Sequence, residues 1–147
     1  MRSSRGQDLK SHMNMQTTHN CMPVSRAENK LAGAAQAFSY DFRGKTVLDI
    51  GSSTGGFTEY VLLRGAKKVI AVEKGTKQMK APLRFDSRID LREKTDIFSV
   101  TRDSLSKNQD EIKVDTILAD VSFISLKQVL IHVKAQLASS QTDFSSC

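Results

Sequence analysis

The amino-acid sequence predicts an α/β protein built on a doubly wound parallel sheet. Apolar runs rich in β-branched residues, at 46–50, 68–73 and 114–119, are typical of buried parallel strands. Segments with apolar residues at helical spacing alternate with these runs along the chain. Strands that alternate with helices form a parallel sheet with helices on both faces, which is the Rossmann-like arrangement.

The first helix is predicted from a capping sequence at its start. Ser25 and Glu28 lie three residues apart, so the hydroxyl and the carboxylate can each satisfy a free backbone amide. Apolar residues then recur at helical spacing as far as Phe38, and Lys30 lies at the margin of their face. We expect this helix to end near Phe38.

The first strand, 46–50, leads through a loop of small residues into a short helix at 56–64. Gly65 is placed to end that helix. The second strand then follows at 68–73, so this part of the chain reads as strand, helix and strand.

Beyond the second strand the pattern is weaker as far as residue 113. Pro82 interrupts a short helix or turn at 78–86, and a weak strand is predicted at 89–92. A clear strand follows at 114–119, and the segment 125–137 has the apolar spacing of a helix.

The chain of 147 residues is about the size of one domain, which we expect to occupy 23–138. Residues 1–22 are polar and lack the apolar core and the cleavage site of a secretory signal, which predicts a disordered tail. Residues 139–147 are too few for a further strand, helix and strand. We therefore expect a disordered end there and a sheet that lacks its last strands.

The composition argues against several classes of protein. No apolar run reaches the ~20 residues that a membrane span requires, so no membrane role is expected. Cys21 and Cys147 lie near the two ends and the histidines are scattered, so neither a disulfide framework nor a metal site is predicted. These features fit a reducing, cytoplasmic setting.

The net charge of +6 arises in one part of the chain. Residues 61–94 hold ten Lys and Arg against four Asp and Glu, whereas the remaining residues balance. Such a basic sector can attract the phosphate backbone of RNA, although a solvated surface explains the same residues equally well. The ten residues are Arg64, Lys67, Lys68, Lys74, Lys77, Lys80, Arg84, Arg88, Arg92 and Lys94.

The strongest candidate site is the loop at 51–57, which joins the first strand to a helix. Its small residues let a ligand approach the backbone closely, and ligands of open parallel sheets bind at this edge. Glu73 ends the second strand, 22 residues after Gly51. This spacing is close to the ~20 residues expected for a carboxylate that accepts hydrogen bonds from the hydroxyl groups of a ribose. Together the two features predict an adenosine-containing cofactor.

The loop does not match a dinucleotide site. A pyrophosphate is held by Gly-x-Gly-x-x-Gly, and Ser53 stands at the second glycine position. S-adenosylmethionine has no phosphate and fits better, with Thr95 and Asp96 after the third strand as candidates for the adenine. Glu73 can alternatively cap a helix and Asp96 can brace a turn, so structural roles stay open for both.

Three motifs occur in order along the chain: SRAENKL at 25–31, DIGSSTGGFT at 49–58 and ADVSFISL at 119–126. Over 24–137 the chain resembles the TlyA, hemolysin-like branch of the FtsJ-type RNA methyltransferases. The resemblance implies the class I methyltransferase fold and S-adenosylmethionine-dependent methylation of a ribose 2′-hydroxyl. It also implies rRNA or a ribosomal subunit as the partner.

The family's catalytic set is Lys, Asp, Lys and Glu, and two of its members have counterparts here. Lys30 corresponds to the first lysine and Asp120 to the aspartate. An ammonium group can stabilise a developing alkoxide, and a carboxylate can hold the attacking hydroxyl near the methyl group. The candidate cofactor-binding residues are Asp49, Gly51, Ser53, Thr54, Gly55, Gly56, Phe57, Glu73, Lys74, Asp96 and Asp120.

The chain departs from the family pattern at both ends. The second lysine and the glutamate belong to later strands, and we do not expect the helical Lys134 to substitute for that lysine. The tail at 1–22 is too short for the small RNA-binding domain of full-length members. We therefore expect an incomplete form with weak or no activity, in which an exposed sheet edge can promote self-association.

Three other functions remain as alternatives. A non-catalytic RNA-binding remnant would depend on the basic sector at 61–94. A membrane-lytic role, suggested by the hemolysin name of the relatives, lacks a long apolar or amphipathic stretch. A nicotinamide dehydrogenase is disfavoured because Ser53 interrupts the glycine pattern.

Overall fold

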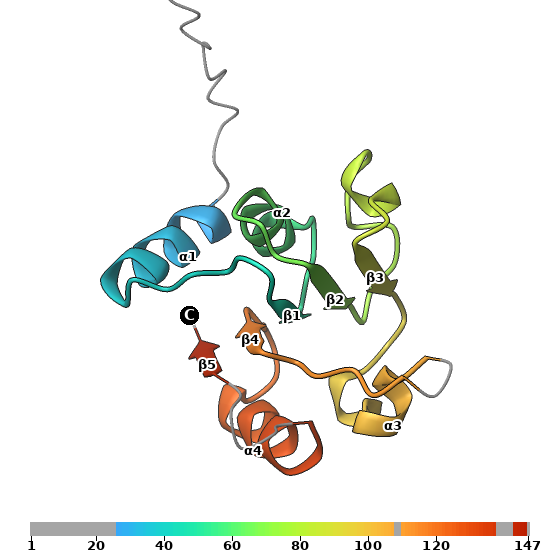
Figure 1. The fold of residues 1–147 in the computed structure, drawn as a ribbon. Coiled ribbons are helices and arrows are strands. Elements are labelled where there is room, and N and C mark those ends of the chain that lie inside the picture. The colour runs from blue at the N-terminus through green and yellow to red at the C-terminus, as the bar shows by residue number, and fades with distance from the viewer. Residues whose placement is uncertain (1–25, 108–109, 138–142, 147) are drawn as a thin grey trace, which may run out of the picture.

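The computed structural model describes residues 26–107, 110–137 and 143–146. Five strands form one parallel sheet in the order β3-β2-β1-β4-β5, with the first strand at its centre (Figure 1). The strands are β1 (Thr46–Ile50), β2 (Lys68–Val72), β3 (Ile89–Arg92), β4 (Thr116–Ala119) and β5 (Asp143–Ser146).

Helices cover both faces of this sheet. In the view of Figure 1, α1 and α2 lie on one side of the strands, and α3 and α4 lie on the other. The α-helices are α1 (Arg26–Ala37), α2 (Gly56–Leu63), α3 (Arg102–Leu105) and α4 (Leu126–Gln136). Two short 3-10 helices are η2 (Leu83–Phe85) and η3 (Ile97–Ser99). The doubly wound α/β fold predicted from the sequence is therefore confirmed.

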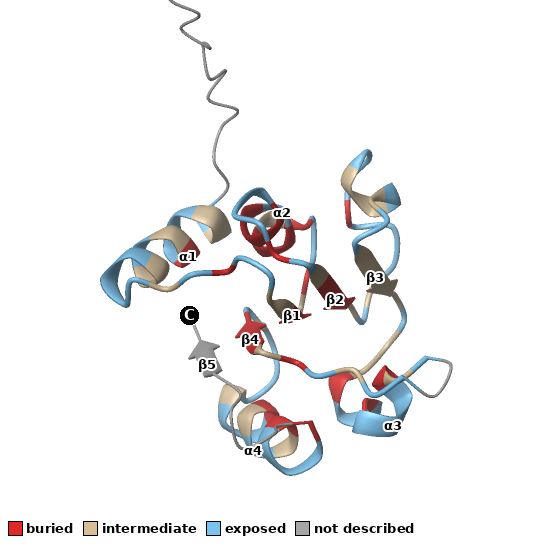
Figure 2. Ribbon diagram, in the orientation of Figure 1, coloured by how far each residue is buried: buried red, intermediate tan, exposed pale blue. Residues whose placement is uncertain are grey.

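Strands β1, β2 and β4 are buried on both faces, to which successive strand residues point in turn. In β1, Val47 packs in the apolar cluster on the α2 side, where Val61 is also buried. Its neighbour Leu48 packs in the opposite cluster with Val129 and Val133 of α4. Figure 2 shows the resulting buried layer along β1, β2 and β4. Continuous apolar runs are required for this double burial, which explains why these strands were readable from the sequence.

The winding reverses at β1. The chain passes from β1 to β2 through α2 on one face, and it reaches β4 from β3 through α3 on the other face. In sheets of this kind the reversal opens a crevice outside the carboxyl ends of the strands. The loops after β1, β2, β3 and β4 therefore meet at one edge of the sheet.

The expectation of a disordered end over 139–147 is wrong for residues 143–146. These residues form β5, in which Asp143 lies opposite Thr116 and Ser146 opposite Ala119 of β4. Two parallel strands that follow one another in the chain must be joined by a crossover connection, and α4 lies in the connection between β4 and β5. Residues 138–142 and 147, like the predicted tail at 1–22, lie outside the described residues.

The boundaries of the predicted strands and longer helices differ from expectation by two residues at most, whereas only Leu83–Phe85 of the predicted short helix or turn at 78–86 form a helix. Strand β4 begins at Thr116 and not at residue 114, and α4 begins after Ser125, whose side chain accepts the Gln128 amide as an N-cap. Helix α3 was not anticipated. It is a single turn closed by a capping box between Thr101 and Ser104, too short for periodicity to reveal it.

Candidate cofactor pocket

Gly51 allows the ends of β1 and β4 to approach each other. Its φ is +78°, and a Cβ there would lie 2.5 Å from the carbonyl oxygen of Asp120. The Asp120 amide in turn donates to the carbonyl of Ile50 at 3.1 Å, and the Gly51 amide donates to the carbonyl of Val72 at 2.9 Å. Only glycine fits both the left-handed backbone and the close contact. Asp120 is thereby held beside the loop that follows β1.

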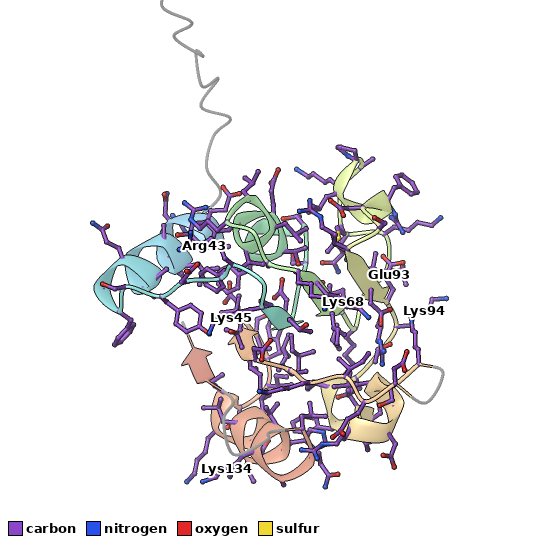
Figure 3. All side chains as sticks on the ribbon, viewed as in Figure 1. Arg43, Lys45, Lys68, Glu93, Lys94 and Lys134 are labelled. Carbon is purple, nitrogen blue, oxygen red and sulfur yellow. The ribbon has the colours of Figure 1, made fainter. Side chains whose placement is uncertain are left out.

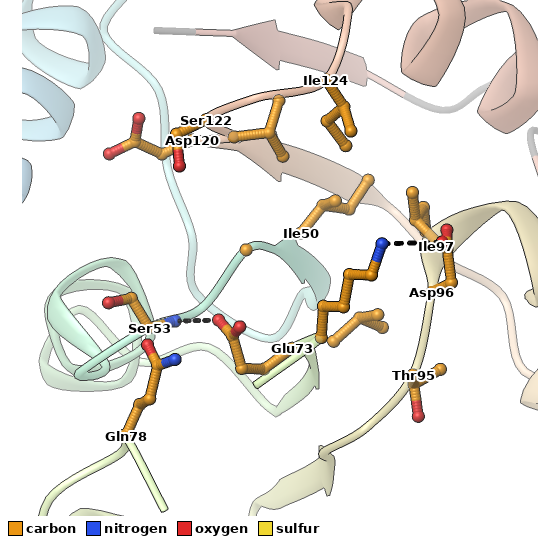
Figure 4. Close-up of a pocket in the computed structure, with 14 residues that line it drawn as sticks. Ile50, Ser53, Glu73, Gln78, Thr95, Asp96, Ile97, Asp120, Ser122 and Ile124 are labelled. Atoms are coloured by element: carbon orange, nitrogen blue, oxygen red, sulfur yellow. Dashed lines mark hydrogen bonds and ion pairs between the residues drawn. The ribbon is translucent and has the colours of Figure 1, made fainter. Parts of the chain in front are cut away.

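Glu73, directly after β2, is tied to the same loop. Its Oε2 accepts the Ser53 amide at 2.8 Å, which Figure 4 marks with a dashed line, and its Oε1 accepts the Gly75 amide at 2.8 Å. Each carboxylate oxygen can accept a second hydrogen bond. The carboxylate is therefore fixed in position and can still bind a hydroxyl group.

These loops surround a pocket at the carboxyl ends of the strands (Figure 4). It is bounded by the loop after β1, by the ends of β2 and β3, and by the segment after β4. The lining residues are Ile50, Gly51, Ser53, Val72, Glu73, Lys74, Gln78, Thr95, Asp96, Ile97, Asp120, Val121, Ser122 and Ile124.

An ion pair joins the ends of β2 and β3 across this pocket. Lys74 Nζ lies 3.5 Å from Asp96 Oδ2 (Figure 4). Asp96 also accepts the Phe98 amide at 3.0 Å and so caps η3. The turn-bracing role left open for Asp96 is therefore confirmed, and the same side chain lines the pocket.

Asp49 lies beneath the loop, fully buried within β1. Thr58 of α2 donates its hydroxyl to Asp49 Oδ2 at 2.7 Å, whereas Oδ1 has no hydrogen-bond partner among the described residues. Burial raises the pKa of Asp49 to about 7, the Thr58 hydrogen bond lowers it in part, and the negative charge of Asp120 adds to the rise.

Residues 23–147 match the FtsJ-like methyltransferase family. The chain belongs to this family. Over 107 residues this FtsJ-like chain is 43% identical to 16S/23S rRNA (cytidine-2′-O)-methyltransferase TlyA of Mycobacterium tuberculosis, covering 73% of the chain and 38% of that protein. It is 37% identical over 127 residues to Hemolysin A of Brachyspira hyodysenteriae, covering 86% of the chain and 51% of that protein. The chain thus spans about half or less of the length of these curated relatives.

The resemblance inferred from the three sequence motifs is confirmed.

The fold comparison agrees with the sequence comparison. A solved structure of a hemolysin-like protein from Lactococcus lactis superposes with a TM-score of 0.74 and 34% identity, covering 84% of the FtsJ-like chain and 57% of that protein. No helix in the described part of the chain is long and apolar enough to cross a membrane. The same part holds no cluster of three or more His, Cys, Asp or Glu suited to a metal ion.

Six of the residues predicted from the sequence lie together in the pocket. They are Gly51, Ser53, Glu73, Lys74, Asp96 and Asp120, and Thr95, the other candidate for the adenine, lines the pocket with them. The rest of the loop points elsewhere. Phe57, in the first turn of α2, is buried in the core, and a Cβ on Gly55, whose φ is +100°, would lie 2.4 Å from Leu83 Cδ2. Thr54, Gly55, Gly56 and Phe57 thus shape the loop without lining the pocket. Lys30 is exposed on α1, also outside the pocket lining.

Gln78 is a pocket residue that the sequence pattern did not reveal. A Cβ on Gly75 would lie 2.2 Å from Gln78 Nε2 and 3.3 Å from Glu73 Oε1, so Gly75 leaves the space in which Gln78 approaches Glu73. The segment holds no strand or helix that would have fixed the direction of this side chain. A glycine two residues after the strand-ending carboxylate was the one available signal.

Proposed function

We propose that this chain binds S-adenosylmethionine in the pocket and contributes to methylation of a ribose 2′-hydroxyl of rRNA. The observation that supports this most is the convergence of Glu73 and Asp120 on the loop at Gly51. The carboxylate on the second strand suits the ribose of an adenosine, and the loop suits the amino acid portion. Family membership favours the same chemistry.

The charges of the pocket fit a cation better than a phosphate. Three carboxylates line it, from Glu73, Asp96 and Asp120, and the one lysine among the lining residues, Lys74, is paired with Asp96. S-adenosylmethionine carries a sulfonium and an ammonium group, which such a lining attracts. A pyrophosphate would be repelled there, which agrees with Ser53 in place of the second glycine.

Two residues of the chain are proposed to act on the substrate. When bound, S-adenosylmethionine supplies a methyl group that a ribose oxygen can attack. Asp120 is exposed at the rim of the pocket, where its carboxylate can accept a hydrogen bond from the attacking hydroxyl and hold it in line. Lys30 is proposed to stabilise the negative charge that develops on the ribose oxygen. The remaining candidates, Asp49, Thr54, Gly55, Gly56 and Phe57, are proposed to support the loop.

The proposal is tested by calorimetric titration of the chain with S-adenosylmethionine. Glu73→Gln keeps the shape of the side chain but loses a charged acceptor, so we expect affinity to fall roughly tenfold or more. Glu111→Gln is the matched control, because Glu111 is exposed and lies outside the pocket lining. It should bind as the parent does.

Two results would contradict the proposal. One is the absence of heat with the parent chain, and the other is equal affinity in the parent and Glu73→Gln. Far-ultraviolet circular dichroism of both variants establishes that neither substitution unfolds the chain.

A second candidate function, RNA binding without catalysis, is favoured by the exposed lysines beyond β2 and β3. It predicts salt-sensitive RNA binding in a chain that gives no heat with the cofactor. Either role would place the chain with the ribosome, in the cytoplasm.

A further inference from the structure

The structure divides the basic sector at 61–94 into two groups. In the first group every arginine side chain has a partner. Arg64 stacks on the Tyr60 ring at 3.4 Å, and the others form ion pairs. These pairs are Arg84 with Glu93 at 3.3 Å, Arg88 with Asp86 at 2.7 Å and Arg92 with Asp90 at 2.9 Å. The three ion pairs neutralise Arg84, Arg88 and Arg92 within the fold, so most of the excess charge comes from the lysines.

The lysines make up the second group, and their positions differ. Lys67 and Lys68 lie at the start of β2, which in a parallel sheet is the edge opposite the pocket. Lys77, Lys80 and Lys94 instead follow the carboxyl ends of β2 and β3 and are exposed. Figure 3 shows Lys94 at the margin of the molecule beyond β3. Lys77, Lys80 and Lys94 therefore lie on the pocket side, as does Lys74, which lines the pocket and is paired with Asp96.

Hydrogen bonds from the three backbone amides tie these lysines to the segments that follow β1, β2 and β3. The Lys77 amide donates to Glu93 Oε1 at 2.6 Å, and the Lys94 amide donates to the carbonyl of Gly75 at 3.1 Å. The Lys80 amide donates to the carbonyl of Thr54 at 3.4 Å. These contacts place the backbone of Lys77 and Lys94 in neighbouring turns and the backbone of Lys80 beside the loop after β1.

No described carboxylate neutralises these ammonium groups. Glu93, which directly precedes Lys94, already accepts the Lys77 amide and the Arg84 guanidinium. Asp96 is paired with Lys74 at 3.5 Å. The surface therefore keeps the positive charge of three closely spaced lysines, and the acidic groups nearby are occupied.

Two of the three lysines stand where the backbone favours glycine. Lys77 has a φ of +54° and Lys94 a φ of +51°. The left-handed conformation costs a residue with a Cβ roughly 1 kcal/mol or more. The backbone amides of both residues hydrogen-bond in these turns, to Glu93 Oε1 and to the Gly75 carbonyl, and both side chains are exposed.

We infer that Lys77, Lys80 and Lys94 form a track for the phosphodiester backbone of the RNA that enters the pocket. The inference rests on the proposed function for the identity of its ligand. A ribose that reaches Asp120 must bring its flanking phosphates across the rim of the same pocket. A lysine ammonium is a compact point charge that suits such phosphates without selecting sequence.

The test measures RNA binding to the full chain by fluorescence anisotropy, with a fluorescein-labelled single-stranded RNA, over a series of salt concentrations. Removing one ammonium group that neutralises a phosphate should make the slope of log K against log salt shallower by about 0.7. The triple variant Lys77→Gln, Lys80→Gln, Lys94→Gln should therefore lower the slope by roughly 2.

The matched control removes an equal charge from surfaces away from the pocket. It combines Lys67→Gln and Lys68→Gln, at the start of β2, with Lys134→Gln in the last turn of α4. Its slope should equal that of the parent. Lys77→Gly serves as a second check, because it removes one charge while relieving the left-handed backbone. It should lower the slope by about 0.7 without lowering the denaturation midpoint.

An unchanged slope in the track variant, or an equal decrease in the track and control variants, would overturn the inference. Calorimetry with S-adenosylmethionine on the same variants separates it from the proposed function. Cofactor binding with no slope difference would remove the track alone. A slope difference without cofactor binding would support the track and remove the methyltransferase assignment.

Discussion

Asp49 is the described carboxylate whose pKa the fold raises, and its position explains why. It lies in the central strand beneath the pocket loop, where Thr58 is the one hydrogen-bond partner of its side chain among the described residues. Asp120 and Glu73 add negative charge nearby. The same arrangement that gathers carboxylates for the pocket therefore makes a charged Asp49 unfavourable.

Asp49→Asn should change how stability depends on pH. The folded-state pKa of about 7 exceeds the ordinary value of 3.8, so the folded chain binds the extra proton between these values. The stability of the parent should therefore fall as pH rises from about 4 to about 7, and then level off. The Asn side chain mimics the protonated acid and should remove this contribution.

Urea denaturation at about pH 5 and about pH 8 measures this effect. Between these values the parent should lose on the order of 2 kcal/mol relative to Asp49→Asn. Parallel pH profiles for the two proteins would show that Asp49 is not protonated in the folded state.

At this scale the sequence specified some site residues and not others. Gly51 and Glu73 were readable because a strand end, a required glycine and a carboxylate at a fixed spacing locate them independently of the loop's path. Which further loop residues face the pocket depends on backbone angles. The φ of +100° at Gly55 turns that part of the loop toward Leu83, and no residue pattern announces such a turn.

At the level of elements, β3 is fixed to the rest of the fold by a partly buried charge network. Asp90 accepts from Arg92 at 2.9 Å and from Lys107 at 2.7 Å, and Arg92 also donates to the Ser104 and Leu105 carbonyls at 2.7 and 3.3 Å. Burial raises the pKa of Asp90, but the hydrogen bonds from Lys107 and Arg92 outweigh it and hold the pKa below its ordinary value. The network links an edge region of the sheet to α3.

Asp90→Asn should therefore destabilise the fold by about 1 to 3 kcal/mol at neutral pH, because two cations lose their acceptor. The lowered pKa means that this stabilisation is present above the ordinary value and is lost as pH falls through the folded-state value. Urea denaturation at neutral and acidic pH should show the deficit of the variant shrinking in acid.

The matched control for this experiment is Asp86→Asn. Asp86 also pairs with the arginine two residues on, Arg88, at 2.7 Å, but that arginine side chain is 47% exposed against 15% for Arg92. Solvent screening should make the destabilisation smaller in Asp86→Asn than in Asp90→Asn. Equal destabilisation would show that β3 does not depend on burial of its ion pair.

The elements that the sequence specified are those with apolar patterns. Strands β1, β2 and β4 are buried on both faces, so their residues had to be aliphatic. Strand β5 has the sequence DFSS, which carries no such pattern, and it forms by pairing with β4. Edge strands of this kind are determined by the neighbouring backbone more than by their own residues, so the pattern could not reveal this one.

At the scale of the whole molecule, the pocket follows from topology. The strand order places β1 at the reversal of winding, and parallel strands bring their carboxyl ends to one edge. Residues far apart in sequence, from Gly51 to Asp120, thus meet without any local signal for their contact. The fold class and the site's location were predictable for this reason, whereas Gln78 and the placement of Lys30 depended on loop and helix packing.

The central claim is that this pocket receives S-adenosylmethionine. The most direct measurement is a crystal structure of the chain grown with saturating S-adenosylhomocysteine, the product of methyl transfer. We expect the ribose hydroxyls to hydrogen-bond to Glu73 and the adenine to lie near Asp96. The amino acid portion should lie along Gly51 and Ser53. A chain that crystallises without the ligand under these conditions, or that holds it on another surface, would contradict the claim.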